Sequence, residues 1–367
     1  MTDYDEPMPA SDDILESSTR AGILGGQLQE QSQDELQEQE ELDRYGDNDS
    51  AIELSSTSSS TSSVSSSILN YRTINGRAYH SDRWDLEYWG PVDEPQIEAL
   101  EYYDLAFFAL LGRKLHRAPL EENIERALDI GTGTGRWAID FANEYPDADV
   151  VGTDISPIQK RLVPENLWFE LDDCTQDWTW DDDYFDFVHI RWLAGSVKDW
   201  GCLFAEAYRY LKPGGFLESH EPSFQFRSDH ESIKPGSALA ELGEVFVKAG
   251  QKTGCSFTIA DDGTQKKSMQ DAGFIIVREE RFKMPIGGWC KDPKLKELGK
   301  IALEAFRWDL DGYLLYVTTQ VLSWSEDNAR NLAMRVRRQL REEKMYVYVK
   351  HNVVVGQKPQ SPYDSHV

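Results

Sequence analysis

The sequence predicts an α/β fold in which a largely parallel β-sheet carries helices on both faces. Three observations support this class. Residues 127–130 form a short apolar run that ends in alternating glycines, and a helical pattern follows at residues 136–143. Four more strand-like segments recur along the chain, and several of them end in acidic residues. Strands that alternate with helices in this way are typical of sheets built from βαβ units.

The first strand leads into a loop that contains three glycines. Glycine adopts positive φ readily and lets the main chain approach a ligand, while amides at the start of the following helix favour an anionic group. A dinucleotide site needs a glycine where this chain has Arg136, so the spacing favours S-adenosylmethionine (SAM) over NAD. A purely structural turn remains the alternative. The ligand loop that we expect comprises Gly131, Thr132, Gly133 and Gly135.

The next two strands also end in polar residues. Residues 150–154 form a second strand whose last residue, Asp154, is followed by Ile155. An acid at this place in a doubly wound fold accepts hydrogen bonds from ribose hydroxyls, although it can equally serve as a turn or helix cap. Residues 167–171 form a third strand that leads to Asp173 and Cys174, which we expect at the adenine ring.

The remaining elements follow in order. Residues 185–191 form a fourth strand, and a Leu-Lys-Pro-Gly-Gly turn leads into a fifth at residues 211–218. Helical patterns occupy residues 238–249, 293–310 and 325–342, and a helix ends at a glycine stop at residues 268–273. Residues 274–277 and 345–355 supply two more strands. The insertion at about 286–344 should cover the active site and select the substrate.

The chain before the first strand divides into two regions. Residues 1–67 hold sixteen acidic residues against two arginines and a nearly unbroken Ser/Thr run, which predicts a disordered acidic, Ser-rich tail. Residues 68–125 are rich in aromatics, and apolar residues recur at helical spacing over 94–115. We expect a helical lid that crosses the ligand edge of the sheet, although most of these aromatics could simply seal one flank. The domain proper is expected at residues 126–367.

Composition excludes several classes of function. The formal net charge of -27 disfavours direct binding to nucleic acid, which requires basic residues to neutralise phosphates. No apolar run is long enough to span a bilayer and no signal peptide is evident, so a protein of the nucleus or cytoplasm is expected. The four cysteines show no spacing suited to a metal site.

Taken together, the motifs resemble those of a known family. The segments are residues 75–80, 127–138, 154–159, 185–191, 193–196 and 211–218. They are similar to those of class I SAM-dependent methyltransferases, in particular the fungal LaeA-like family. The resemblance implies a Rossmann-like sheet of seven strands whose last strand is antiparallel. It also implies that SAM is the cofactor, with Asp129 and the glycine loop at its methionine end, Asp154 at the ribose and Asp173 with Cys174 at the adenine.

The sequence offers several candidates for a catalytic group. Methyl transfer from a sulfonium releases a neutral leaving group, so positioning can supply most of the rate and a general base adds a smaller factor. His220 and Glu221, which follow the fifth strand, are the preferred base candidates. His189 and Arg191 lie on the fourth strand. His189 could equally be a core histidine with no catalytic role, and Arg191 could bind an acidic group of the substrate. Tyr79 in the lid is a further candidate.

Two functions of different kind remain open. The first is an enzyme that methylates a small-molecule secondary metabolite or a protein side chain with SAM. The second is a regulator that acts mainly through its partners, because the resemblance implies nuclear regulators of secondary metabolism and development with velvet-type regulatory proteins as partners.

Overall fold

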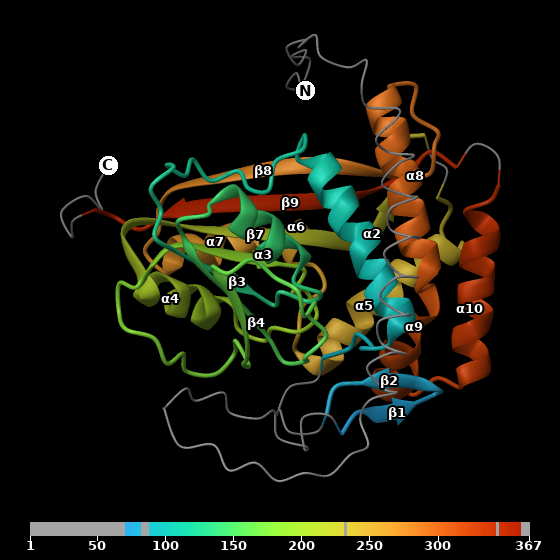
Figure 1. The fold of residues 1–367 in the computed structure, drawn as a ribbon. Helices are drawn as coiled ribbons and strands as arrows, with labels where there is room; N and C mark the ends of the chain where they lie inside the picture. The colour runs from blue at the N-terminus through green and yellow to red at the C-terminus, as the bar shows by residue number, and fades with distance from the viewer. Residues whose placement is uncertain (1–69, 82–87, 231–232, 343–344, 361–367) are drawn as a thin grey trace. The chain divides into compact units, whose positions relative to one another are not determined.

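The computed structural model describes residues 70–81, 88–230, 233–342 and 345–360, so the predicted acidic tail lies outside the described residues. The described chain contains a seven-stranded sheet in the order β5-β4-β3-β6-β7-β9-β8 (Figure 1). Strands β3 to β7 run parallel, and β9 pairs antiparallel with both β7 and β8. The predicted α/β class, the seven-stranded Rossmann-like sheet and the antiparallel last strand are confirmed.

Most strands begin and end close to the predicted residues. The parallel strands are β3 (Arg126–Ile130), β4 (Asp149–Asp154), β5 (Leu167–Leu171), β6 (Phe185–Arg191) and β7 (Leu211–Arg227). The antiparallel pair is β8 (Ile275–Ile286) and β9 (Val347–Gln357). The prediction of only four residues for β8 was too short because charged residues alternate along this edge strand and give it no continuous apolar run.

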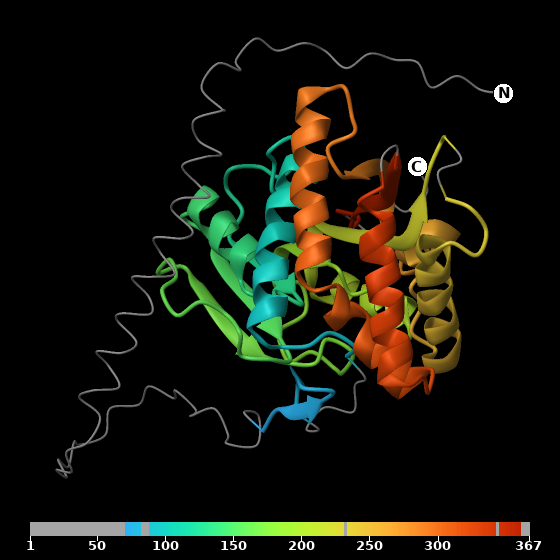
Figure 2. The same ribbon diagram turned by 90° about the vertical axis from the view of Figure 1, so that its right-hand side faces the viewer.

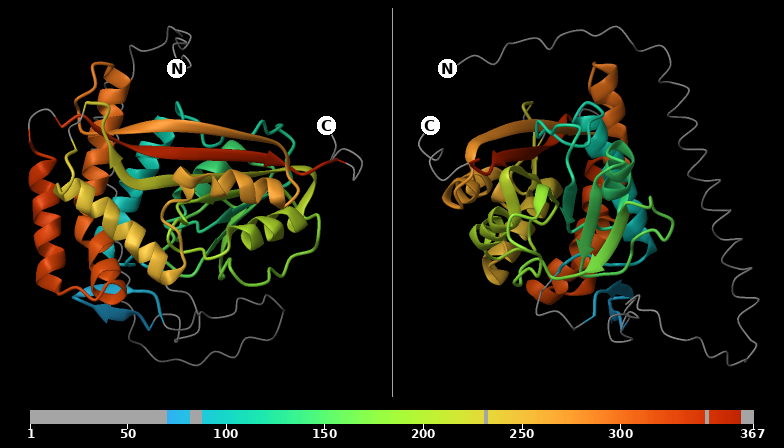
Figure 3. Two further views of the ribbon diagram at one scale, coloured as in Figure 1. Left: turned by 180° about the vertical axis from the view of Figure 1, so that it is seen from behind. Right: turned by 60° about the vertical axis from the view of Figure 1, so that its left-hand side comes forward.

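Helices cover both faces of the sheet, as the right-hand view of Figure 3 shows. On one face, α3 (Arg136–Glu144) buries Trp137 and Phe141 against Ala127 and Phe187 of the strands. On the other face, α4 (Trp200–Tyr210) and α7 (Thr264–Asp271) pack with the short helix α6 (Ile259–Asp262) nearby. The alternation of side chains along each strand supplies apolar groups to both layers.

A third core lies beyond the end of the sheet, where helices from distant parts of the chain meet. It brings together α2 (Glu94–Leu110), α5 (Ala238–Thr253), α8 (Pro293–Trp308), α9 (Leu310–Tyr316) and α10 (Glu326–Gln339). Helices α2 and α8 lie side by side along much of their length (Figure 2). The segment between the two predicted insertion helices is itself helical, ending in a π-helical turn at Val317–Val321. No described helix has the length and apolar character that crossing a bilayer would require.

A small hairpin at the start of the described chain anchors the region before α2. Strands β1 (Arg72–Ile74) and β2 (Arg77–Tyr79) pair antiparallel. The guanidinium of Arg77 donates to Asp93, the residue before α2, at 2.7 Å and to Asp309, the residue before α9, at 2.6 Å. One side chain therefore ties the hairpin to both helices.

Candidate functional site

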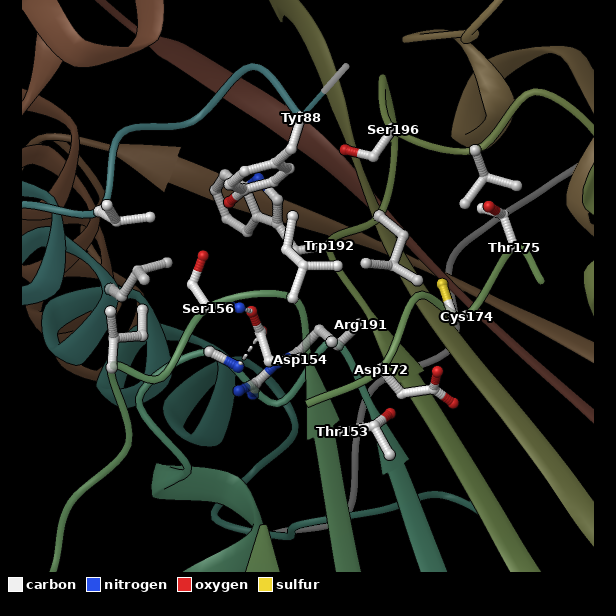
Figure 4. Close-up of a pocket in the computed structure, with 18 of the residues that line it drawn as sticks. Tyr88, Thr153, Asp154, Ser156, Asp172, Cys174, Thr175, Arg191, Trp192 and Ser196 are labelled. Atoms are coloured by element: carbon white, nitrogen blue, oxygen red, sulfur yellow. Dashed lines mark hydrogen bonds between the residues drawn. The ribbon is translucent and has the colours of Figure 1, made fainter. Parts of the chain in front are cut away.

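A pocket lies at the carboxyl ends of β3 to β6, which is the edge where open α/β sheets bind ligands. Its polar lining includes Thr153, Asp154, Ser156, Asp172 and Arg191 (Figure 4). Its other walls come from the region before α3 and from the loop after β6. Those residues are mostly apolar: Tyr88, Pro91, Val92, Leu100, Trp192, Leu193 and Val197.

The glycine loop forms the floor of this pocket. Gly131, Gly133 and Gly135 all have positive φ, at 68°, 58° and 79°. Gly131 and Gly133 line the pocket, and their positive φ angles favour glycine at both positions. Gly135 instead caps the N-terminus of α3, and Thr132 donates to Asp129 below the loop. Neither of these two residues is part of the pocket lining.

Asp154 lies between the glycine loop and the next turn. Its Oδ2 accepts a hydrogen bond from the Gly133 amide at 2.9 Å, and its Oδ1 accepts from the Ser156 amide at 3.0 Å. Burial raises the pKa of this carboxyl to about 6, while the two amide hydrogen bonds oppose the shift. Ile155 lines the pocket beside it. The acid thus shapes the loop and faces the pocket at once.

The third strand places a different acid in the pocket from the one that the sequence indicated. Asp173 is buried, and its oxygens accept from the Thr175 amide at 2.9 Å, the Thr175 hydroxyl at 2.7 Å and the Gln176 side chain at 3.3 Å. Asp172, Cys174 and Thr175 line the pocket instead. The acid pair at the strand end was visible in the sequence. Side chains alternate between the two faces of a sheet only within the strand, and both acids follow its last residue. The sequence pattern therefore could not show which of the two acids faces the ligand.

Asp129 was expected at the methionine end of a cofactor, but its carboxylate points into the protein. One oxygen lies 2.7 Å from Nδ1 of His189 and the other accepts from the Thr132 hydroxyl at 2.6 Å. Burial raises the pKa of Asp129 to about 7, and the hydrogen bond from Thr132 opposes the shift. Asp129 supports the loop from below and does not line the pocket.

The preferred base candidates are fully buried within the sheet. His220 lies 2.5 Å through Nε2 from Glu218, and Glu221 accepts from the backbone amides of Leu193 and Ala194 at 3.1 and 2.9 Å. Burial raises the pKa of Glu221 to about 8, with the amide hydrogen bonds opposing it. Neither side chain lines the pocket. Glu221 instead holds the loop that follows β6, because Leu193 belongs to that loop.

The other three catalytic candidates have different surroundings. His189 is fully buried and stacks on Trp137 with ring centroids 3.7 Å apart. Tyr79 is buried against Tyr316 in the helical core. Arg191 is the member of the set that lines the pocket, where it forms an ion pair with Asp104 of α2.

Two pocket residues were not assigned to the ligand site from the sequence. Trp192 has a positive φ of 61°, which is rare for a large side chain. Its ring lies 4.4 Å from that of Tyr103 and 5.4 Å from that of Phe107. Tyr88 lines the pocket from the region before α2, where the aromatic richness indicated a lid without identifying this residue. Among the described residues, no cluster of His, Cys, Asp and Glu has the arrangement of a metal site.

Comparison with known proteins identifies the family. Residues 103–278 match a family model described as a methyltransferase domain. The chain is 35% identical over 304 residues to the methyltransferase pytC of Aspergillus terreus, an alignment that covers 83% of this chain and 93% of that protein. It is 34% identical to the secondary metabolism regulator LAE1 of Cochliobolus heterostrophus, covering 78% of this chain and 94% of that protein. It is 30% identical to the protein-methionine methyltransferase laeA of Emericella nidulans, covering 78% and 76% respectively.

These relatives are aligned with this chain over three quarters or more of their own length. The resemblance drawn from the motifs is thereby confirmed, and so are the enzyme class and the cofactor that it implied. The chain belongs to the class I SAM-dependent methyltransferases, within their LaeA-like family.

Proposed function

We propose that this methyltransferase acts on a small acceptor that enters beside Trp192, while SAM lies across the glycine loop. The observation that carries the proposal is the mixed lining of the pocket. It includes the glycine loop with Asp154 and Asp172, and it also includes apolar and aromatic groups such as Trp192. The polar groups fit an adenosyl amino acid, and the apolar groups fit a largely hydrocarbon acceptor.

The residues present are suited to the cofactor. Asp154 retains free lone pairs for the ribose hydroxyls, because each of its oxygens accepts one amide hydrogen bond. We assign the adenine end to Asp172, Cys174 and Thr175, which line the pocket, in place of Asp173, which does not. Arg191 is the cation in the described lining, so we assign it to a carboxylate, either that of SAM or an acidic group on the acceptor.

The lid expected before the first strand is supported in part by the same geometry. Tyr88, Pro91 and Val92 come from residues 68–125 and line the pocket, as does Leu100 of α2. We retain this segment as a lid domain. The insertion at 286–344 contributes no described residue to the pocket lining. The insertion packs on α2 and α5. It can therefore influence the choice of substrate only indirectly, through the positions of these two helices.

Positioning is the main catalytic device that we assign to this pocket. SAM supplies an activated methyl group on a positively charged sulfur. Transfer of this methyl group leaves a neutral thioether. None of the base candidates His189, His220 and Glu221 is part of the described lining. Holding two reactants in line is worth about 7–11 kcal/mol of barrier, more than the 10²- to 10⁴-fold that a general base typically adds.

Calorimetric titration with SAM tests the assigned site. Asp154→Ala removes the ribose partner and Gly133→Arg fills the floor of the pocket, so both variants should lose binding. Asp182→Ala alters an exposed carboxylate in the pair with Arg209 and should bind like the wild type. Unchanged affinity in both pocket variants would exclude this site, whatever the acceptor.

A second function is supported by the relatives that carry the name of secondary metabolism regulators. In that case the fold would bind partners in the nucleus, with velvet-type regulatory proteins as the expected class. Deletion of residues 1–67 should then abolish capture of such a partner and leave SAM affinity unchanged. Metabolite profiles separate the two functions, because Asp154→Ala should reproduce a full gene deletion only where methyl transfer is required.

A further inference from the structure

A chain of hydrogen bonds joins the middle of the sheet to the glycine loop. His189 of β6 contacts Oδ1 of Asp129 through Nδ1 at 2.7 Å. The other oxygen of Asp129 accepts from the Thr132 hydroxyl at 2.6 Å. Thr132 lies between Gly131 and Gly133, which form the pocket floor. Three buried side chains therefore connect β6 to the part of the loop that faces the ligand.

The surroundings of His189 favour a neutral ring with one N–H. Burial lowers its pKa well below the usual value, and His220, Arg191 and His116 lower it further, while Glu218 acts in the opposite direction. Its ring lies parallel to that of Trp137 of α3, at an interplanar angle of 6°. Its Nε2 has no hydrogen-bond partner among the described residues. Asp129 is thus the polar partner toward which the ring is directed.

We propose that His189 is a positioning residue for the methyl donor, which fixes the glycine loop through Asp129 and Thr132. This inference rests on the proposed function, because it assumes that the loop binds SAM. His189 does not line the pocket, so it acts through Asp129 and touches no reacting atom. The bond to Asp129 holds one carboxylate oxygen and leaves the other directed at Thr132.

The two other buried histidines nearby lack this connection. His220 directs Nε2 to Glu218, which in turn accepts from the amides of Arg117 and Ala118. His351 is buried beside the Phe107 ring, and neither of its ring nitrogens has a described hydrogen-bond partner. His351 therefore provides a matched control, since it is as buried as His189 but is not bonded to Asp129.

Paired substitutions separate positioning from packing. In His189→Asn the side-chain amide nitrogen can replace Nδ1 as a donor to Asp129, whereas His189→Leu fills space without a donor. We expect titration with S-adenosylhomocysteine at pH 8 to show affinity within about threefold of the wild type for Asn and a loss of at least about tenfold for Leu. That loss corresponds to about 1.4 kcal/mol. His351→Asn and His351→Leu should both bind normally.

Two results would overturn the proposal. One is equal loss in His189→Asn and His189→Leu, which would indicate packing alone, and the other is normal binding in both. If His189→Leu fails to fold, Thr132→Val tests the same chain from its other end, because it removes the hydroxyl donor at similar volume. Affinity unchanged in Thr132→Val would also overturn the inference. Failure of the wild type to bind S-adenosylhomocysteine would instead contradict the proposed function.

Discussion

Asp154 and Gly133 lie 21 residues apart in the chain and are joined by a hydrogen bond of 2.9 Å between Oδ2 and the backbone amide. The contact fixes the glycine loop against the end of β4. Asp154 also accepts from the Ser156 amide, as a turn-forming aspartate would. The structural and the ligand-binding interpretations of this acid are therefore compatible, because one carboxylate performs the first role and still lines the pocket.

The affinity for the cofactor should depend on pH through Asp154. Burial raises its pKa to about 6, and the ionised form is the better acceptor for ribose hydroxyls. Binding should therefore weaken as the pH falls through about 6. One site with this pKa predicts an affinity at pH 5 that is about tenfold lower than at pH 8. Titration with S-adenosylhomocysteine from pH 5 to pH 8 measures the change.

Asp154→Asn serves as the control for this pH dependence. Asp129 and Asp104 have pKa values raised to about 7 and about 6, so they titrate over the same range in both proteins. The ratio of wild-type to variant affinity cancels their contribution and should fall about tenfold from pH 8 to pH 5. A constant ratio would contradict the assignment. For folding the sign is opposite, because a raised carboxyl pKa means that stability decreases as the pH rises from about 4 to 6.

Gly135 should tolerate alanine far less than a glycine of similar backbone conformation. Gly135 and Gly236 have φ of 79° and 75°, so alanine carries a similar backbone strain of about 1–2 kcal/mol at either position. A Cβ on Gly135 would collide with the Phe169 ring, whereas a Cβ on Gly236 meets nothing within 4 Å. Gly135→Ala should therefore lose about 3 kcal/mol or more of unfolding free energy in urea. Similar losses for the two variants would show that the ring can move aside.

The sequence predicted the central fold well because each parallel strand is a short apolar run with its own end signal. The segments at residues 167–171 and 185–191 agree with β5 and β6 to the residue. The glycine spacing and the acid at residue 154 were enough to place the ligand edge. These features are local, so neighbouring residues along the chain determine them.

The catalytic candidates were harder to predict because their surroundings come from distant segments. His220 and Glu221 follow a strand-like run and were expected at its exit, but β7 continues to Arg227 and keeps both residues inside the sheet. Pairing with β9 extends the strand, and no local pattern announces that partner. Trp192 was missed for the same reason, since its ring packs against Tyr103 and Phe107 of α2, which lie far away in the sequence.

Trp192 should show backbone strain that a paired truncation can measure. With φ at 61°, alanine at this position retains the cost of the left-handed conformation, and glycine relieves it. The free energy of unfolding of Trp192→Gly should therefore be about 1 kcal/mol higher than that of Trp192→Ala, although both variants lose the packing of the ring. Phe204 lies buried within α4, where the order should reverse because glycine disfavours a helix by about 1 kcal/mol. The same order at both positions would contradict stored strain at Trp192.

Arg77 should be among the most sensitive residues outside the pocket. Its substitution by methionine would leave the carboxylates of Asp93 and Asp309 without their shared cation, and the side chain of Asp309 is only 3% exposed. Loss of one partner from such a buried cluster costs about 3–5 kcal/mol.

The matched control for this prediction is Arg209→Met, which breaks an exposed pair with Asp182 and should leave the free energy of unfolding nearly unchanged. The loss of unfolding free energy in Arg77→Met should become smaller as the pH falls from 7 towards 5. Burial already raises the pKa of Asp309, and without Arg77 both carboxyls can take up protons at higher pH than before. Unfolding in urea at the two pH values measures the change. A deficit that does not depend on pH would show that Arg77 contributes through the packing of its stem and not through its charge.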